Sequence, residues 1–126
     1  MEMIELAAVS AEALAYFGDA VMELFVRERL VQCGISDAGR LNTAAKDYVP
    51  APKQSEAVER ILPLLCEEEA SLYHRGRNMG GHAHPKAATV GEYRRATGLE
   101  ALLGGLYLTG REDRARELFE IAFPRE

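Results

Sequence analysis

Residues 96–110 read ATGLEALLGGLYLTG, and this stretch decides the fold. It contains one carboxylate, Glu100, and no Lys or Arg, so a helix formed here is apolar around nearly its whole circumference. Such a helix is typical of the buried centre of a protein, with other helices packed around it. Gly98, Gly104 and Gly105 each lower helix propensity, and we interpret them as positions where another helix approaches closely.

Helical patterns on both sides of this stretch predict an all-α fold in a single compact, multi-helix domain. Ser10 as N-cap and Gly34 just past the end frame a long helix over residues 11–32. Thr89 followed by Glu92 is a capping-box pattern for the central helix, which runs to about residue 109. Further helices are expected over these ranges: 37–49, 52–62, 66–77 and 112–123. We find no alternation typical of strands and expect one domain over residues 1–126, with its core at about 10–122.

The composition excludes several classes of protein. The 126 residues are 48% hydrophobic and 28% charged, which fits one globular domain and is too apolar for disorder. No apolar run reaches the ~18 residues of a membrane span, and the acidic N-terminus argues against a signal peptide. Cys33 and Cys66 lack a zinc-ligand spacing and are predicted to be free thiols of a cytoplasmic protein. No glycine-rich phosphate loop follows a strand, which excludes a P-loop or Rossmann nucleotide cofactor.

One segment of this acidic chain is basic. The formal net charge is −5, yet residues 74–95 contain five Lys or Arg against a single acid, Glu92. The five are Arg75, Arg77, Lys86, Arg94 and Arg95. This segregation predicts an anionic ligand bound at one place, while a solvated loop that happens to be basic is the alternative.

Carboxylates form a line along the long first helix, with Asp19 and Glu23 among them. Taken alone, such a line is typical of a solvated face. Glu100 changes that interpretation, because a buried carboxylate needs a cation, hydrogen bonds or a metal ion. If the two helices pack together, the acidic line meets Glu100, and converging carboxylates favour Mg²⁺ or Mn²⁺. A buried salt bridge from Glu100 to Arg94 or Arg27 is the alternative.

Two motifs in this sequence resemble those of the ribonuclease III family. Residues 14–24, LAYFGDAVMEL, are similar to its signature helix, and residues 97–108, TGLEALLGGLYL, are similar to its second acidic motif. The basic HRGRN at residues 74–78, with the expected absence of a following double-stranded-RNA-binding domain, resembles the Mini subfamily. The resemblance covers roughly residues 10–122.

The resemblance implies an all-helical endonuclease that acts as a homodimer. It implies Mg²⁺-dependent hydrolysis of double-stranded RNA, with Mn²⁺ as a substitute, and products with 5′-phosphate ends. For the Mini subfamily it implies maturation of the 23S (large-subunit) ribosomal RNA precursor in bacteria. Asp19 and Glu100 match the catalytic, metal-binding positions, and Glu23 is a further candidate ligand. The alternative function is a non-catalytic dimeric RNA-binding module of the same fold.

The sequence departs from the full-length family at three acidic positions. Ala15, Thr97 and Arg40 stand where that family has carboxylates. Fewer carboxylates neutralise less positive charge, which argues against a second cation. The Ala and Thr pattern is shared by the Mini subfamily, so these changes do not imply an inactive enzyme.

The basic segment is predicted to hold RNA phosphates in place of the missing binding domain. The predicted RNA-binding side chains are Arg75, Arg77, Lys86, Arg94 and Lys53. For the dimer interface we expect the central helix and the region around Tyr16 and Phe17. The reason is that an all-round apolar helix exceeds what one small monomer can cover.

Overall fold

The computed structural model describes residues 1–79 and 88–125, in which every regular element is a helix. The elements are α1 (Met3–Leu6), α2 (Ala11–Gln32), α3 (Ala38–Ala45), α4 (Ala51–Ile61), the short 3-10 helix η1 (Leu62–Leu64), α5 (Glu67–Arg77), α6 (Val90–Leu108) and α7 (Glu112–Ala122). The all-α prediction is therefore confirmed for this part of the chain. Among these helices, none combines the length and apolar character needed to cross a bilayer.

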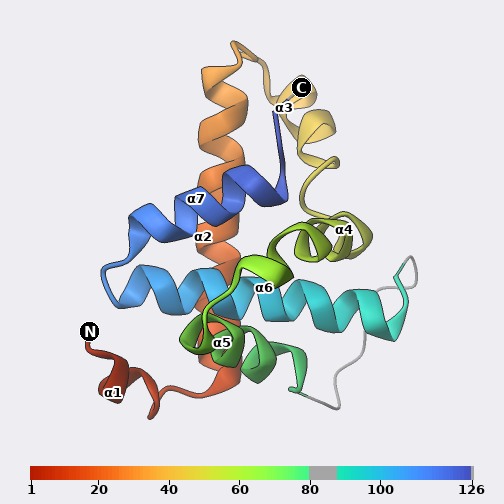
Figure 1. Ribbon diagram of the computed structural model, residues 1–126. Coiled ribbons are helices and arrows are strands. Elements are labelled where there is room, and N and C mark those ends of the chain that lie inside the picture. Colours follow the sequence, from red (N-terminus) through yellow and green to blue (C-terminus); the bar gives the residue numbers. More distant parts are fainter. Residues whose placement is uncertain (80–87, 126) are drawn as a thin grey trace.

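The central helix of the fold is α6. It packs against α2, α4, α5 and α7, and Figure 1 shows α2 crossing it at a steep angle. Its leucines Leu99, Leu102, Leu103 and Leu106 are at most 1% exposed. The other helices of the chain thus cover these four leucines of α6. Val90, at the start of α6, is 51% exposed, and a role of this helix in a dimer interface stays a prediction.

The two longest helices begin and end where their caps predict. The hydroxyl of Ser10 accepts a hydrogen bond from the backbone N–H of Ala13 at 3.0 Å, which starts α2. Gly34 follows α2 with a φ of 88°, a left-handed conformation that glycine adopts without strain. At the start of α6, Thr89 and Glu92 exchange side-chain to backbone hydrogen bonds of 2.9 and 3.0 Å, the predicted capping box.

Burial does not follow hydrophobicity alone in this fold. Leu24 is 45% exposed, while Gly18 and Met22 of the same helix are buried. The cause is the crossing of α2 with α6, which turns a face containing glycine toward the core. Leu62 is 39% exposed because α4 gives way to η1 there, next to a proline. Leu6 of α1, a helix that the sequence does not signal, is 1% exposed.

An ion pair inside the fold fixes α5 to α7. Arg114 donates from Nε and Nη2 to the two carboxylate oxygens of Glu69, at 2.8 and 3.0 Å. This hydrogen bonding lowers the pKa of Glu69 to about 2, against the opposing effect of burial. The contact orients α5, which carries part of the basic segment at its other end. Cys33 and Cys66 are free, as predicted, and both are exposed.

Candidate functional site

Helices α2 and α6 touch through glycine backbone. A Cβ atom on Gly18 would overlap the backbone carbonyl of Glu100, and one on Gly104 would lie 2.5 Å from the carbonyl oxygen of Leu14. Neither position has room for a side chain. The prediction that Gly104 marks a close approach is confirmed. The sequence interpretation misses Gly18, although a glycine in the middle of a helix and directly before an acid was the available signal.

This crossing brings two carboxyl groups together. Asp19 follows Gly18 on α2, and Glu100 is the residue of α6 that Gly18 contacts. Burial raises the pKa of Glu100 to about 9, assisted by a hydrogen bond to Asp19 and by the negative charge of Asp19. Without a bound cation, a carboxyl group with this raised pKa keeps its proton at neutral pH.

The salt-bridge alternative for Glu100 does not occur in the described part of the chain. Arg27 instead pairs with Glu23, with Nε 3.1 Å from a carboxylate oxygen. Arg94 is exposed, and within residues 1–79 and 88–125 no ion pair includes Glu100. Among the described residues, the two carboxyl groups at the crossing thus have no ion-pair partner from the protein itself.

The donor set at the crossing fits Mg²⁺. This ion is usually held by one or two carboxylates, and water or substrate oxygens complete its coordination. Among the described residues, no group of three or more His, Cys, Asp or Glu forms a fuller metal site, and Glu23 is engaged with Arg27. Glu23 as a ligand stays a prediction.

At the three positions where this chain departs from the full-length family, no nearby acid among the described residues takes the place of the missing carboxylate. Ala15 and Thr97 are buried, and the hydroxyl of Thr97 donates to the carbonyl of Tyr93 at 2.9 Å. Arg40 lies exposed on α3 beside Asp37, and Asp37 is the N-cap of that helix. Asp19 and Glu100 are therefore the carboxyl groups that the described fold brings together at the crossing.

Part of the basic segment converges where α5 ends and α6 begins. The buried phenol of Tyr73 has its pKa raised by burial, and the charges of Arg77 and Arg95 oppose that rise. The two arginines come from different helices, Arg77 from the end of α5 and Arg95 from the first turns of α6. Arg94 is exposed beside them, roughly 9 Å along the helix axis from Glu100. The prediction for Lys86 falls outside the described residues.

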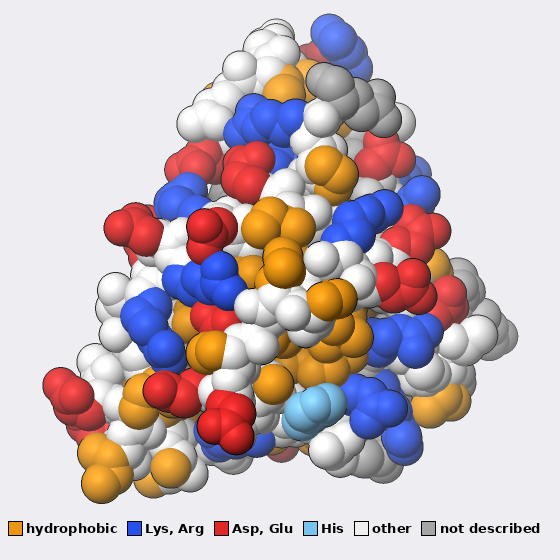
Figure 2. All heavy atoms as spheres, in the orientation of Figure 1, with side chains coloured by type: hydrophobic (Ala, Val, Ile, Leu, Met, Phe, Trp, Pro, Cys, Tyr) orange, Lys and Arg blue, Asp and Glu red, His pale blue; other side chains and the backbone are white. Residues whose placement is uncertain are grey.

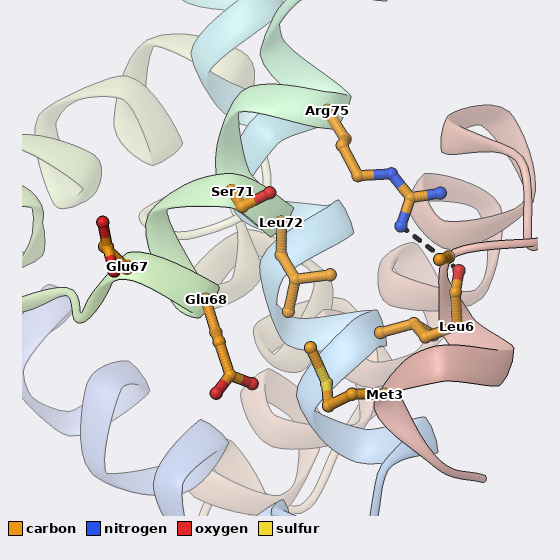
Figure 3. A pocket seen from close by; sticks show the side chains of 8 residues that line it. Met3, Leu6, Glu67, Glu68, Ser71, Leu72 and Arg75 are labelled. Atoms are coloured by element: carbon orange, nitrogen blue, oxygen red, sulfur yellow. Dashed lines mark hydrogen bonds between the residues drawn. The ribbon is translucent and has the colours of Figure 1, made fainter.

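Arg75 has a different environment from the other basic residues of this segment. Its guanidinium donates to the backbone carbonyls of Leu6, at 3.3 Å, and of Val9. Figure 3 shows the side chain reaching from α5 across to the end of α1. Arg75 thus holds the N-terminal segment in place, and its predicted phosphate contact has no support from this geometry.

Many arginines on the body of the protein form ion pairs, and Figure 2 shows basic and acidic side chains interspersed over one face. The arginines of α7 illustrate the pattern, because Arg114 and Arg116 each contact two glutamates. Lys53, Arg77 and Arg94 differ. All three are exposed, and within the described ranges none of them forms an ion pair with a carboxylate.

Comparison with known proteins gives one consistent result. A family model described as the Ribonuclease III domain matches residues 12–111. A Mini-ribonuclease 3 of Symbiobacterium thermophilum is 44% identical over 109 residues, which cover 86% of this chain and 84% of that protein. A Mini-ribonuclease 3 of Desulfitobacterium hafniense is 46% identical, over 89% of this chain and 71% of its own length. The crystal structure of a Fusobacterium nucleatum protein aligns with a TM-score of 0.83 at 33% identity, covering 93% of each chain.

The protonated carboxyl at the crossing predicts an unusual dependence of stability on pH. Folded Glu100 keeps its proton up to about pH 9, whereas an ordinary glutamate loses it near 4.5, so between these values the unfolded chain binds fewer protons. The free energy of unfolding should therefore fall as the pH rises through this window. Glu100→Gln should remove much of this dependence and raise the free energy of unfolding at pH 8 by about 1–3 kcal/mol.

Urea unfolding at pH 5, 7 and 9 with a chelator measures this effect. Glu23→Gln is the matched control, because it removes a partly exposed carboxylate of α2 that pairs with Arg27. Equal pH slopes in the two variants would show that Glu100 titrates normally.

Proposed function

The chain belongs to the ribonuclease III family of endoribonucleases, and we propose that it hydrolyses double-stranded RNA at a Mg²⁺ ion held by Asp19 and Glu100. The observation that carries this proposal is the pair of carboxyl groups at the crossing of α2 and α6, with no protein cation to neutralise it in the described part of the chain. Mn²⁺ is the proposed substitute, since it accepts the same oxygen ligands.

The residues at the crossing have distinct tasks in this proposal. A bound Mg²⁺ would polarise a phosphate oxygen and lower the pKa of an attacking water. Asp19 supplies a ligand from α2, and Glu100 supplies one from α6 after it loses its proton. Hydrolysis is proposed to leave a phosphate on the 5′ end of the downstream fragment.

RNA recognition is proposed to rest on the exposed cations near the start of α6. Arg77 and Arg94 would neutralise backbone phosphates, with Lys53 on α4 and Lys86 as further contributors. Duplex RNA would be recognised by shape, phosphates and 2′-hydroxyls, because the A-form major groove is too narrow for side chains. From the likeness to the Mini subfamily, the proposed substrate is the 23S ribosomal RNA precursor in the bacterial cytoplasm.

We further propose a two-fold symmetric dimer. A duplex has two strands related by pseudo-two-fold symmetry, and two sites related by the same symmetry can each cut one strand. Tyr16 is 83% exposed three residues before Asp19 and is the proposed contact, whereas Phe17 is used inside the monomer against Tyr107.

Sedimentation at micromolar concentration should give about twice the 13.9 kDa mass of one chain, and Tyr16→Lys should shift the equilibrium toward monomer. The control is Ile4→Lys, which changes an equally exposed side chain on α1. A parent protein that sediments as a monomer would contradict the dimer.

Asp19→Asn should abolish cleavage of a duplex RNA in Mg²⁺ and leave RNA binding within about twofold of the parent, because it removes a metal ligand and no phosphate contact. Gel assays of cleavage and of binding in a chelator measure the two effects separately. Cleavage by the variant at the parent's rate would refute the assignment. A parent protein that binds duplex RNA and never cuts it would favour the non-catalytic binding module.

The double substitution of Arg77 and Arg94 by alanine should weaken binding about equally for all duplex sequences. It should also flatten the dependence of log affinity on log salt by roughly 0.9 for each phosphate that is no longer neutralised, a figure for B-DNA carried over to RNA. Arg125→Ala is the control, because this exposed arginine already pairs with Glu120 on α7. Unchanged affinity and slope in the double variant would assign RNA binding to another surface.

A further inference from the structure

Gly104 and Gly105 are adjacent on α6 but face different helices. A Cβ on Gly104 would lie 2.5 Å from the backbone oxygen of Leu14 and 2.9 Å from the backbone nitrogen of Gly18, both on α2. A Cβ on Gly105 would lie 2.8 and 2.9 Å from the two methyl carbons of Leu72 on α5. The end of a leucine side chain can change rotamer, whereas backbone atoms inside a helix move only with the helix. A methyl group added at position 104 therefore has to push α2 away.

The separation of α2 and α6 at this point controls the distance between the two acidic groups. Asp19 is next to Gly18 on α2, and Glu100 lies about one turn before Gly104 on α6. Each carboxyl group is attached to a rigid helix by a short side chain. An increase in the helix separation thus moves the two groups apart, and no other described carboxylate is grouped with them to compensate.

We propose that Gly104 is a positioning residue, which sets the separation of Asp19 and Glu100 and thereby the size of the cation that they prefer. This inference rests on the proposed function, since it assumes that the pair binds a metal ion. Mg²⁺ requires oxygen ligands at about 2.0–2.1 Å, whereas Ca²⁺ accepts about 2.3–2.6 Å and tolerates irregular geometry. A crossing made by two glycines brings the carboxyl groups as close as two helices allow, which favours the smaller ion.

The test compares Gly104→Ala with Gly105→Ala in the full chain. Both variants gain the higher helix propensity of alanine, so they differ mainly in the helix that the new methyl group meets. Calorimetric titration with MgCl₂ and CaCl₂, in the absence of RNA, gives the affinity for each ion, and circular dichroism gives the melting temperature. For Gly105→Ala, both affinities should stay within about twofold of the parent. For Gly104→Ala, the Mg²⁺ affinity should fall about tenfold and the Ca²⁺ affinity by clearly less.

A rescue variant separates positioning from general damage to the fold. Asp19→Glu adds one methylene and extends the carboxyl group toward Glu100. In the Gly104→Ala background it should recover about threefold or more in Mg²⁺ affinity, while the same change in the parent should lower that affinity. Asp19→Glu would thus raise the Mg²⁺ affinity in one background and lower it in the other, which a general loss of stability does not produce.

Equal ratios of Mg²⁺ to Ca²⁺ affinity in the two alanine variants would overturn the inference. If Gly104→Ala does not fold, Asp19→Glu in the parent carries the test. A crossing fixed by backbone contact cannot adjust to the longer side chain, so the ligand geometry becomes irregular, which Ca²⁺ tolerates better than Mg²⁺. The preference should therefore shift toward Ca²⁺ about fivefold or more, and an unchanged preference would overturn the inference. A parent that binds no Mg²⁺ overturns the proposed function as well. If the parent binds Mg²⁺ and cuts duplex RNA, and Gly104→Ala has the same Mg²⁺ and Ca²⁺ affinities as the parent, only the positioning role is overturned.

Discussion

The direct contact between the backbones of α2 and α6 is the constraint on which the rest of the structure depends. Gly18 and Gly104 allow the two longest helices to cross with no side chain between them at the point of contact. This close crossing places Asp19 against Glu100, and it leaves the remaining sides of α6 to be covered by α4, α5 and α7. The same geometry has a cost, because two acidic groups share a partly buried place and one of them is protonated when no cation is present.

Much of the fold is predictable from the sequence because its signals are local. Ser10 and Thr89 cap their helices with hydrogen bonds to residues three positions away, and such bonds follow from the sequence alone. The orientation of α2, in contrast, is not determined by residues nearby in the sequence. Hydrophobicity ranks Leu24 above Gly18 for burial, but the close contact with α6 decides the outcome and leaves the leucine in solvent.

In the candidate site, too, some features can be predicted from the sequence and others depend on contacts between distant residues. Glu100 can be recognised because it is the single carboxylate in a long apolar helix, and the approach of a second helix is signalled by the glycines near it. The contacts of Arg75 could not be predicted from the charge pattern. Its partners are the carbonyls of Leu6 and Val9, which lie 69 and 66 residues away in the sequence, and counting charges gives no information about backbone acceptors.

The adjacency of Gly104 and Gly105 limits how this protein can change over evolutionary time. The first glycine packs on α2 and the second on α5, so a sideways or rotational shift of α6 that relieves one contact compresses the other. The middle of the helix is therefore a poor place for adaptation. New substrate preferences can arise more easily at the ends of α6 and in the segments that adjoin it, where an insertion or a new side chain leaves both contacts intact. A mutant library directed at those flanks, with residues 98–105 held constant, would sample new specificities while it preserves the scaffold.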